Sequence, residues 1–355
     1  MEMIDTMRSF LSPDLFSISD RHQFTVQPSV LEQDDETGKL IAKEEYRLFG
    51  NTFGQKAYYN GERFNVSING HGLLCQYSAP RIVTGSNRFS VGHGGLCEAI
   101  KQAEASLAQI GVKADYLQAS LVRLDMFRNL EAEQTFRDYA PLFGQLRAKR
   151  QQKRDYGTTF LWHNKSQETC IYSKRDEMLA KGQDTAGIPD NLLRFELRYL
   201  KGQKIRASLP VATVAHLTER DRYEGIKRQY YEQMRRTVFA LEPDRVRQIV
   251  STDIRGVLKM DDKRTDFWKN LAVVQFQAQG FSLEDFSEAI RVGLEEDFPE
   301  MEQTTKRQTL HRYVSDYKAA QVAALAIQDN GKTRAELYLE LFHKFFDDPV
   351  ARCAG

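Results

Sequence analysis

The chain has 355 residues, of which 41% are hydrophobic and 28% charged, a composition that is typical of a soluble globular protein and excludes a disordered or fibrous one. The formal net charge of +1 argues against indiscriminate binding of polyanions, although it allows local basic surfaces. No apolar run approaches the roughly 18 residues that span a bilayer, and the amino terminus lacks a basic segment followed by an apolar one. We therefore expect a cytoplasmic protein with no membrane contact.

The first predicted elements are strands. A strand is expected at residues 7–11, and residues 63–69 alternate apolar and polar side chains before Asn69-Gly70, a strong signal for a tight turn. That run should fold back onto residues 73–77 as a hairpin. Residues 80–95 are rich in Gly, Ser and Arg, and residues 84–88 predict a loop with backbone amides free to meet a phosphate, although it matches no nucleotide-binding fingerprint.

Helices and strands alternate from there to about residue 200. The periodicity predicts helices at 96–110 and 135–150, a strand at 121–127, a hairpin of residues 156–162 and 168–174, and a strand at 192–199. This order indicates an α+β protein with a mainly antiparallel central sheet flanked by helices, in a domain that spans residues 1–204.

The strand signal fades from residue 205 onward. Expected helices lie at residues 211–217, 219–241, 264–278, 283–292, 305–324 and 333–345. We therefore predict a helical carboxyl-terminal domain over residues 205–355 that contacts DNA or a protein partner.

Three of the predicted strands carry reactive or charged groups on one face. Side chains alternate along a strand, so one face of residues 168–174 holds Glu168, Cys170, Tyr172 and Lys174. The other two strands set polar residues against an apolar face in the same way: Arg123 and Asp125 in the first, and Arg194, Glu196 and Arg198 in the second. A solvated polar face explains any one of these strands. Three together predict a surface where a tyrosine, carboxylates and cations converge.

The four cysteines are scattered without a Cys-x-x-Cys pair, which predicts free thiols and neither a zinc site nor a disulfide framework. Cys170 lies two residues before Tyr172, and we interpret it as a packing or site-lining residue.

Basic residues cluster beside aromatic ones in two places. They are Arg147, Lys149, Arg150, Lys153 and Arg154 before the tyrosine hairpin, and Arg222, Lys227, Arg228, Arg235 and Arg236 along residues 219–241. A charge run is usually a solvated helix face, so clusters next to aromatic residues are a partial indication of nucleic-acid binding. The candidate DNA contacts are Arg150, Lys153, Arg154 and Arg228, together with Arg123, Arg194 and Arg198.

Short motifs follow one another in a characteristic order over residues 1–200. They are Met3-Ile-Asp-Thr-Met7, Gly85-Ser-Asn87, Leu124-Asp-Met-Phe-Arg-Asn129, Tyr156-Gly-Thr-Thr-Phe160, Asn164-Lys-Ser166, Ile171-Tyr-Ser-Lys174 with Glu177, and Leu193-Arg-Phe-Glu-Leu197. In these motifs the chain resembles the replication initiators of filamentous phages, the gene II and gene X proteins, and their relatives among rolling-circle plasmid initiators.

The resemblance implies a site-specific DNA nickase that cuts one strand at an origin, stays joined to the 5′ phosphate through a tyrosine, leaves a 3′ hydroxyl for polymerase and reseals the strand at termination. It makes Tyr172 the nucleophile, and Asp125 and Glu196 ligands of Mg²⁺ or Mn²⁺. The fold it implies is a rolling-circle initiator-like nuclease fold; because the chain has no His-x-His motif, the metal ligands should be carboxylates. The implied partners are origin DNA, as supercoiled duplex and as single strand, with a host helicase and polymerase.

The residue chemistry is compatible with that role. A tyrosine hydroxyl has a pKa of about 10, so it is a poor nucleophile until its proton is removed or its anion stabilised. Lys174 would favour the phenolate or meet the phosphate, and Glu168 would be a third metal ligand or a proton acceptor, with Glu177 as its competitor. The arginines Arg123, Arg194 and Arg198 have two equal interpretations, phosphate contact or ion pairing with the neighbouring acids.

Two other functions stay open: a non-catalytic DNA-binding replication regulator, and a transposase or relaxase with related chemistry. A second tyrosine would serve termination, with Tyr156, Tyr230 and Tyr231 as candidates, although paired tyrosines more often pack or stack on bases. The oligomeric state is not indicated by the sequence.

Overall fold

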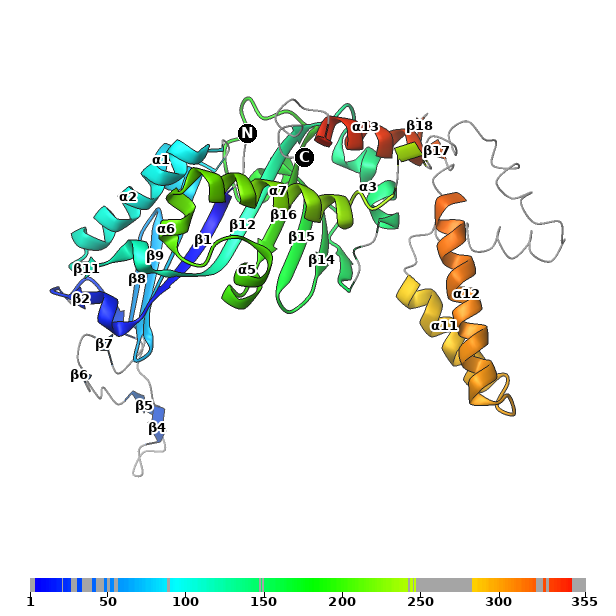
Figure 1. Ribbon diagram of the computed structural model, residues 1–355, viewed down its shortest axis with the longest axis horizontal. Helices are drawn as coiled ribbons and strands as arrows, with labels where there is room; N and C mark the ends of the chain where they lie inside the picture. The colour runs from blue at the N-terminus through cyan, green and yellow to red at the C-terminus, as the bar shows by residue number, and fades with distance from the viewer. Residues whose placement is uncertain are drawn as a thin grey trace.

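The structure is a computed structural model that describes residues 4–20, 22–26, 31–33, 40–42, 48–49, 52–53, 57–87, 90–146, 148, 150–241, 243–244, 246, 283–323, 328–329 and 332–346. A ten-stranded sheet dominates the described part, and helices lie against it (Figure 1). The strand order is β13-β14-β15-β16-β12-β1-β10-β9-β8-β3, and every pair is antiparallel. The predicted α+β class with an antiparallel sheet is therefore confirmed.

The strands of this sheet are β13 Gln152–Asp155, β14 Thr159–His163, β15 Gln167–Ser173, β16 Leu192–Tyr199, β12 Ser120–Glu131, β1 Ile4–Leu11, β10 Gly72–Ser78, β9 Phe64–Asn69, β8 Ala57–Asn60 and β3 Thr25–Val26. Shorter pairs join β2 Phe16–Ile18 to β11 Val112–Ala114, β4 Leu31–Gln33 to β5 Leu40–Ala42, β6 Leu48–Phe49 to β7 Thr52–Phe53, and β17 Gln328–Asp329 to β18 Lys332–Thr333.

The described helices are α1 Ala79–Thr84, α2 His93–Gln109, α3 Phe136–Gln145, α4 Lys174–Ala180, α5 Gly202–Ser208, α6 Val214–Thr218, α7 Arg220–Arg236, α11 Leu283–Glu296, α12 Gln303–Ala323 and α13 Arg334–Phe346, with single 3-10 turns at Pro13–Leu15 and Tyr116–Gln118. None of them is long and apolar enough to cross a membrane.

The two faces of the central strands differ because their side chains alternate. Phe195 of β16 points to the apolar face, where its ring centroid lies 5.9 Å from that of Phe239 and 5.1 Å from that of Phe345. The hydroxyl of Tyr230 on α7 donates a 2.8 Å hydrogen bond to the Phe195 carbonyl, and α7 crosses the sheet in Figure 1. Helices α7 and α13 thus cover this face, where each buried aromatic ring contributes about 1.5–3 kcal/mol.

The predicted central elements are present with small changes in their ends. The Asn69-Gly70 turn joins β9 to β10, β14 and β15 form the expected hairpin, and β16 covers the predicted residues 192–199. Strand β12 continues to Glu131, beyond the predicted end at residue 127, and pairs with β16 along that extra length.

Helix α1 lies directly before the predicted loop at residues 84–88 and includes residue 84; the sequence analysis placed no helix here. The Ser78 hydroxyl accepts a hydrogen bond from the Arg81 amide at 3.5 Å, and Pro80 lies in the first turn, where a missing N–H costs nothing. Gly85 ends the helix at φ +79°, a conformation that glycine adopts without strain. A Ser followed two residues later by a Pro is a signal for the start of a helix, which the sequence analysis overlooked because the segment is rich in glycine.

Five of the helices predicted for the carboxyl-terminal part are present among the described residues, as α6, α7, α11, α12 and α13. The helix predicted at residues 264–278 lies outside the described residues. Helix α13 is far from the sheet in sequence yet packs on it through Phe345. The division at residue 204 into two domains stays a prediction.

Arg128 of β12 joins the sheet to the end of α13. Its guanidinium donates 2.8 Å hydrogen bonds to the Tyr231 hydroxyl and the Phe345 carbonyl, and a 3.4 Å bond to the Lys344 carbonyl. Arg128 is 8% exposed. The last carbonyls of a helix have no partner within the helix, so this arginine satisfies groups that would otherwise be buried without donors.

We expect Arg128→Ala to lower the free energy of unfolding by about 2–4 kcal/mol, because buried carbonyls lose charged donors. Urea denaturation followed by far-UV circular dichroism measures the change. The control Arg137→Ala removes an exposed arginine from α3 and should change the value by less than about 0.5 kcal/mol. Equal midpoints for the two variants would contradict this role of Arg128.

Candidate active site

The sheet register brings the predicted polar groups together on the face opposite Phe195. Between β15 and β16, the cross-strand partners on this face are Glu168 with Arg198, Cys170 with Glu196, and Tyr172 with Arg194. Between β12 and β16, they are Asp125 with Arg198, Phe127 with Glu196, and Asn129 with Arg194. Directly opposed side chains in a sheet have Cβ atoms about 4.5–5.5 Å apart. The tyrosine and both predicted acidic ligands therefore lie on one surface, as expected.

Two arginines hold the acids at one end of this surface. Arg123 binds Asp125 with both Nε and Nη2, the latter at 2.8 Å from Oδ2. Arg198 bridges Glu196 at 2.9 Å and Glu168 at 3.1 Å. These contacts support the ion-pair interpretation for Arg123 and Arg198, and Glu168 is the most exposed of the three acids, with 23% of its side chain accessible.

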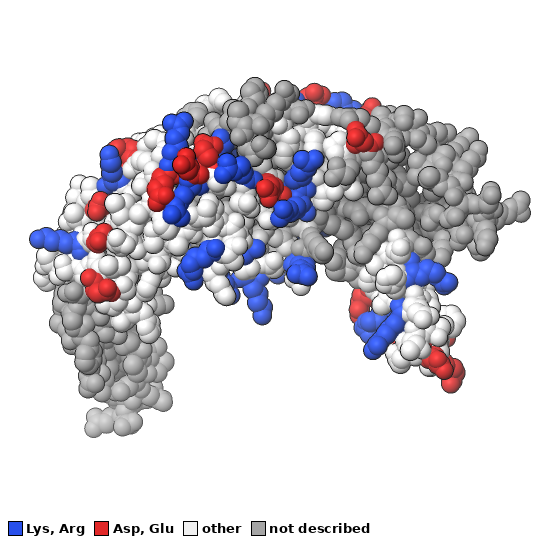
Figure 2. Space-filling view, viewed as in Figure 1, with Lys and Arg blue, Asp and Glu red and all other residues white. Residues whose placement is uncertain are grey.

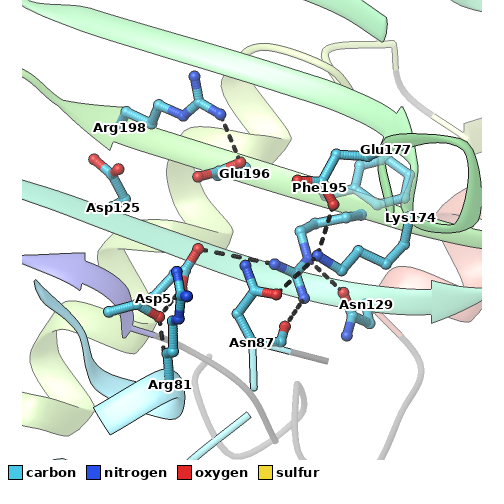
Figure 3. A network of polar contacts seen from close by, with 12 residues as sticks. Asp5, Arg81, Asn87, Asp125, Asn129, Lys174, Glu177, Phe195, Glu196 and Arg198 are labelled. Carbon is cyan, nitrogen blue, oxygen red and sulfur yellow. Dashed lines mark hydrogen bonds and ion pairs between the residues drawn. The ribbon is translucent and has the colours of Figure 1, made fainter. Parts of the chain in front are cut away.

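Arg194 lies at the centre of the second half of the network, and its side chain is fully buried. It donates 2.7 Å and 2.8 Å hydrogen bonds to the Asn129 side chain and the Asn87 carbonyl, and its guanidinium carbon lies 4.0 Å from the centre of the Phe127 ring. Its Nη1 has no hydrogen-bond partner and lies 3.8 Å from Asp5 Oδ2. Figure 3 shows Asp5, Asn87 and Asn129 gathered in this half of the network.

Tyr172 is 7% exposed, and its surroundings are charged. Burial raises the pKa of the phenol well above its usual value, and the negative charge of Glu196 raises it further, while Arg194 lowers it. In turn, interaction with Tyr172 raises the pKa of Arg194 and lowers that of Glu196. The hydroxyl is therefore in a polar, desolvated position, neutral at rest and next to a cation that would stabilise its anion.

Asp5 is a member of this site that the sequence analysis did not select. It is 7% exposed, and it accepts a 2.7 Å hydrogen bond from the Ser78 hydroxyl. Burial raises the pKa of Asp5, and Glu196 raises it further. The register of β1 against β12 shifts between Ile4 and Met7, an irregularity of the kind that redirects side chains. The motif Met3-Ile-Asp-Thr-Met7 contained the only sequence signal for it.

Asp125 and Glu196 have the donor chemistry of a magnesium site. Burial raises the pKa of Asp125 to about 6 despite Arg123, and the charge of Glu196 contributes to the rise. Burial also raises the pKa of Glu196, but Arg198 and Arg194 outweigh it, so the net shift is downward. Mutual repulsion between buried carboxylates is relieved by a cation, and Mg²⁺ commonly uses one or two carboxylates with water and substrate phosphates.

Within the described residues no three acidic, histidine or cysteine side chains form a ready-made metal centre. An ion held by Asp125 and Glu196 would take its remaining oxygens from water and substrate, because Mg²⁺ requires near-octahedral coordination. The third ligand predicted at Glu168 stays a prediction.

Lys174 is the first residue of α4, after the N-cap Ser173, and its side chain is fully buried. Its ammonium group donates to Glu177 at 2.8 Å and to the Asn87 side chain at 3.4 Å. Burial and then the charge of Arg194 lower the pKa of Lys174, and Glu177 opposes them. Glu177 thus forms an ion pair with Lys174, and Glu168 forms one with Arg198. The two acids considered for the third ligand position therefore have different partners.

The candidate DNA contacts divide into groups. Arg150, Arg154 and Arg228 are exposed, whereas Lys153 is partly buried and donates to the Gly144 carbonyl. Three basic residues of α7 pair with nearby acids: Arg222 with the N-cap Glu219, Lys227 with Glu224, and Arg236 with Glu232. Figure 2 shows this mixture of charges over α7. Three of the five residues in this predicted basic cluster are therefore paired with acids, and Arg228 is an exposed cation.

The tyrosine candidates for a second function also separate. Tyr230 and Tyr231 are buried against Phe345, so packing is their role. Tyr156 is 57% exposed in the turn before β14, where Thr159 pairs with Tyr172. It is the candidate that lies both near Tyr172 in the sheet and in contact with solvent.

The expectation that residues 84–88 offer free amides is wrong for two of them, and residue 88 lies outside the described residues. The Gly85 amide donates to the Arg81 carbonyl at 2.9 Å, and the Ser86 amide to the Thr84 hydroxyl at 3.4 Å. The loop instead supports the site, because Asn87 accepts from both Arg194 and Lys174.

The raised pKa of Asp125 predicts how the stability of the protein depends on pH. The folded carboxyl binds its proton more tightly than the unfolded one, so the stability of the wild type relative to Asp125→Asn should fall as the pH rises from about 4 to about 6. The fall is about 3 kcal/mol at most, and the difference should be level above that range. Urea denaturation of both proteins between pH 4 and 8 measures it, with Glu98→Gln as the control for loss of an exposed carboxylate. A difference that does not vary with pH would contradict the shift.

The comparisons with known proteins bear on the same strands. No curated protein matches the chain. A solved structure titled "Structure of Rolling Circle Replication Initiator Protein from Geobacillus stearothermophilus" is similar at 11% sequence identity, covering 56% of this chain and 73% of that chain, with a TM-score of 0.26, which is too low to support an argument. Residues 81–215 match the family model that describes the N-terminal part of a phage replication-associated protein. The candidate site residues Asp125, Tyr172 and Glu196 all lie inside this part of the chain, which is similar to the phage replication-associated protein family.

Proposed function

We propose that this protein initiates rolling-circle replication by nicking one strand of an origin with Tyr172 and later resealing it. The observation that carries the proposal is the position of Tyr172 on one sheet face with Asp125, Glu196 and Arg194, inside the region that matches the replication-associated family. A phenol, two acids and a buried guanidinium are the groups that phosphodiester transfer to tyrosine requires.

In the proposed reaction the Tyr172 oxygen attacks the phosphorus of the scissile phosphodiester. The bond from phosphorus to the 3′ oxygen breaks, and the 5′ phosphate stays on the tyrosine. The phenolic proton passes to a neighbouring carboxylate, for which we assign Glu196, whose charge acts on the pKa of Tyr172, and the departing 3′ oxygen takes up a proton to become a hydroxyl. Because one phosphoester replaces another, the reverse attack by a 3′ hydroxyl reseals the strand without a nucleotide cofactor.

The buried cations stabilise charge in this reaction. Arg194 lowers the pKa of Tyr172, and its Nη1 has a proton to give because no protein acceptor takes it. A phosphate oxygen of the substrate is the acceptor that we assign to this donor. Lys174 adds a positive charge two residues from the nucleophile.

Asp125 and Glu196 would hold Mg²⁺ or Mn²⁺, with Glu168 as the proposed further ligand. Such an ion polarises the scissile phosphate and stabilises charge on the leaving oxygen. The acids themselves must be ionised to bind it, and the pKa of Asp125, raised to about 6 by burial, sets the pH above which this residue is ready.

The proposed partners are origin DNA, as supercoiled duplex and single strand, and a host helicase and polymerase that use the 3′ hydroxyl. The exposed residues Arg150, Arg154 and Arg228 are proposed to contact phosphates, with Lys153 beside them.

Tyr172→Phe should abolish covalent attachment to DNA, because the variant lacks the attacking oxygen, while DNA binding stays within about twofold. The measurement is the SDS-resistant protein–DNA species formed with supercoiled origin DNA and Mg²⁺, alongside a gel-shift assay. Tyr58→Phe, a change at a half-buried tyrosine of β8 in the other half of the sheet, serves as the control and should still form the adduct. An adduct of normal yield in Tyr172→Phe would remove Tyr172 from the role. No adduct with either wild type or variant would favour a DNA-binding regulator.

Glu196→Gln should reduce the rate of nicking at saturating Mg²⁺ by about a hundredfold or more and raise the Mg²⁺ concentration at half-maximal rate, because a neutral amide binds the ion less well and leaves Arg198 without its charged partner. EDTA should stop the wild-type reaction. The matched control Glu98→Gln, on the exposed side of α2, should leave both quantities unchanged. Nicking that is indifferent to EDTA would exclude the metal.

A further inference from the structure

A polar pocket of about 610 Å³ opens beside the charge network. Arg81 of α1 and residues 85–87 line one side, and Lys181, Gln183 and Asp184, which follow α4, line the other. The volume is within the range of small-molecule and cofactor sites, roughly 300–1,000 Å³. The pocket joins two segments that are about one hundred positions apart in the chain and that both support Lys174.

Hydrogen bonds and an ion pair connect the walls of the pocket to the residues around Tyr172. Asn87 lines the pocket and also accepts hydrogen bonds from Lys174 and Arg194. On the opposite wall Lys181 pairs with Glu177, whose other oxygen accepts from Lys174 at 2.8 Å. Lys174 is two residues after Tyr172, so an occupant of the pocket would lie close to the scissile phosphate.

The lining selects a ligand with a negative group and hydrogen-bonding edges. Arg81 and Lys181 are exposed cations suited to a phosphate. The side chains of Asn87, Gln183 and Asp184 offer the donors and acceptors that read the edge of a base. A base inside a duplex is stacked and paired, so only an unpaired base can enter such a recess.

We infer that this pocket binds one nucleotide of single-stranded DNA next to the scissile phosphate, with Arg81 and Lys181 on its phosphate and Gln183 and Asp184 at its base. The inference rests on the proposed function for the position of the nucleotide relative to the cut. The pocket would thereby contribute to the choice of the nick site, since the sheet face itself offers mainly charged groups that contact the backbone.

The test is binding by the full chain carrying Tyr172→Phe, so that no cleavage occurs. The probe is a fluorescein-labelled 12-nucleotide single strand of random sequence, measured by fluorescence anisotropy at several salt concentrations. Arg81→Ala with Lys181→Ala should weaken binding at least tenfold and lower the slope of log K against log salt by about 0.7, as expected for the loss of one neutralised phosphate on a single strand. The control pair Lys113→Ala with Arg137→Ala, which removes the same charge from exposed residues of β11 and α3, should change binding less than twofold.

A second variant tests the base. Gln183→Ala with Asp184→Ala should change the relative affinities for the homopolymers dA12, dC12 and dT12 by at least threefold, with little change in the salt slope. Either pair behaving like the control pair would overturn the inference.

The covalent-adduct assay with intact Tyr172 separates this inference from the proposed function. Binding that depends on the pocket in a protein that forms no adduct would defeat the nicking chemistry alone. An adduct in a protein whose strand binding ignores the pocket would defeat the nucleotide pocket alone.

Discussion

The structure depends on a balance of buried charge across β1, β12, β15 and β16. Asp5, Asp125 and Glu196 are each buried, and Arg194 and Lys174 among the opposing cations are fully buried as well. A buried ion without a partner costs several kcal/mol, and removing one member of a buried pair commonly costs 3–5 kcal/mol. The carboxylates and guanidinium groups therefore hold one another in place, and the site survives burial only as a set.

This balance also leaves specific deficits. Arg194 Nη1 has no hydrogen-bond partner, and the pKa values of Asp5 and Asp125 are raised by burial with a contribution from Glu196. The Arg194 Nη1 donor therefore lacks an acceptor, and Glu196 repels the nearby carboxylates of Asp5 and Asp125. A phosphate oxygen would supply the first need and a divalent cation the second, so the substrate and metal we propose complete interactions that the protein alone leaves unfinished.

The alternation of side chains along the strands assigns stability and chemistry to opposite faces of one sheet. Phe195 points to the aromatic cluster under α7 and α13, while its neighbours Arg194 and Glu196 point to the charge network. Helix α13 from the end of the chain thus supports the strand that carries the site from behind. Tyr172 is buried on the charged face, where burial raises its pKa further above the usual value, and in the proposed reaction it depends on Arg194 to favour its anion.

The sequence by itself determined the central strands and the shared face of Asp125, Tyr172 and Glu196. Two-residue periodicity and the turn at Asn69-Gly70 are local properties, so they need no knowledge of the rest of the chain. Pairing of Arg123 with Asp125 is also local, because two positions on one face of a strand are neighbours.

Only the tertiary structure decided which distant groups meet. Asp5 lies at an irregularity in the pairing of β1 with β12, Asn87 joins the site from a loop, and α13 covers the opposite face. Each of these contacts joins residues more than one hundred positions apart. The neutralisation of α7 and the loss of free amides at Gly85 and Ser86 likewise follow from partners that composition does not specify. Sequence periodicity fixes which way a side chain points, whereas burial, desolvation and ion pairing depend on what the folded chain brings opposite it.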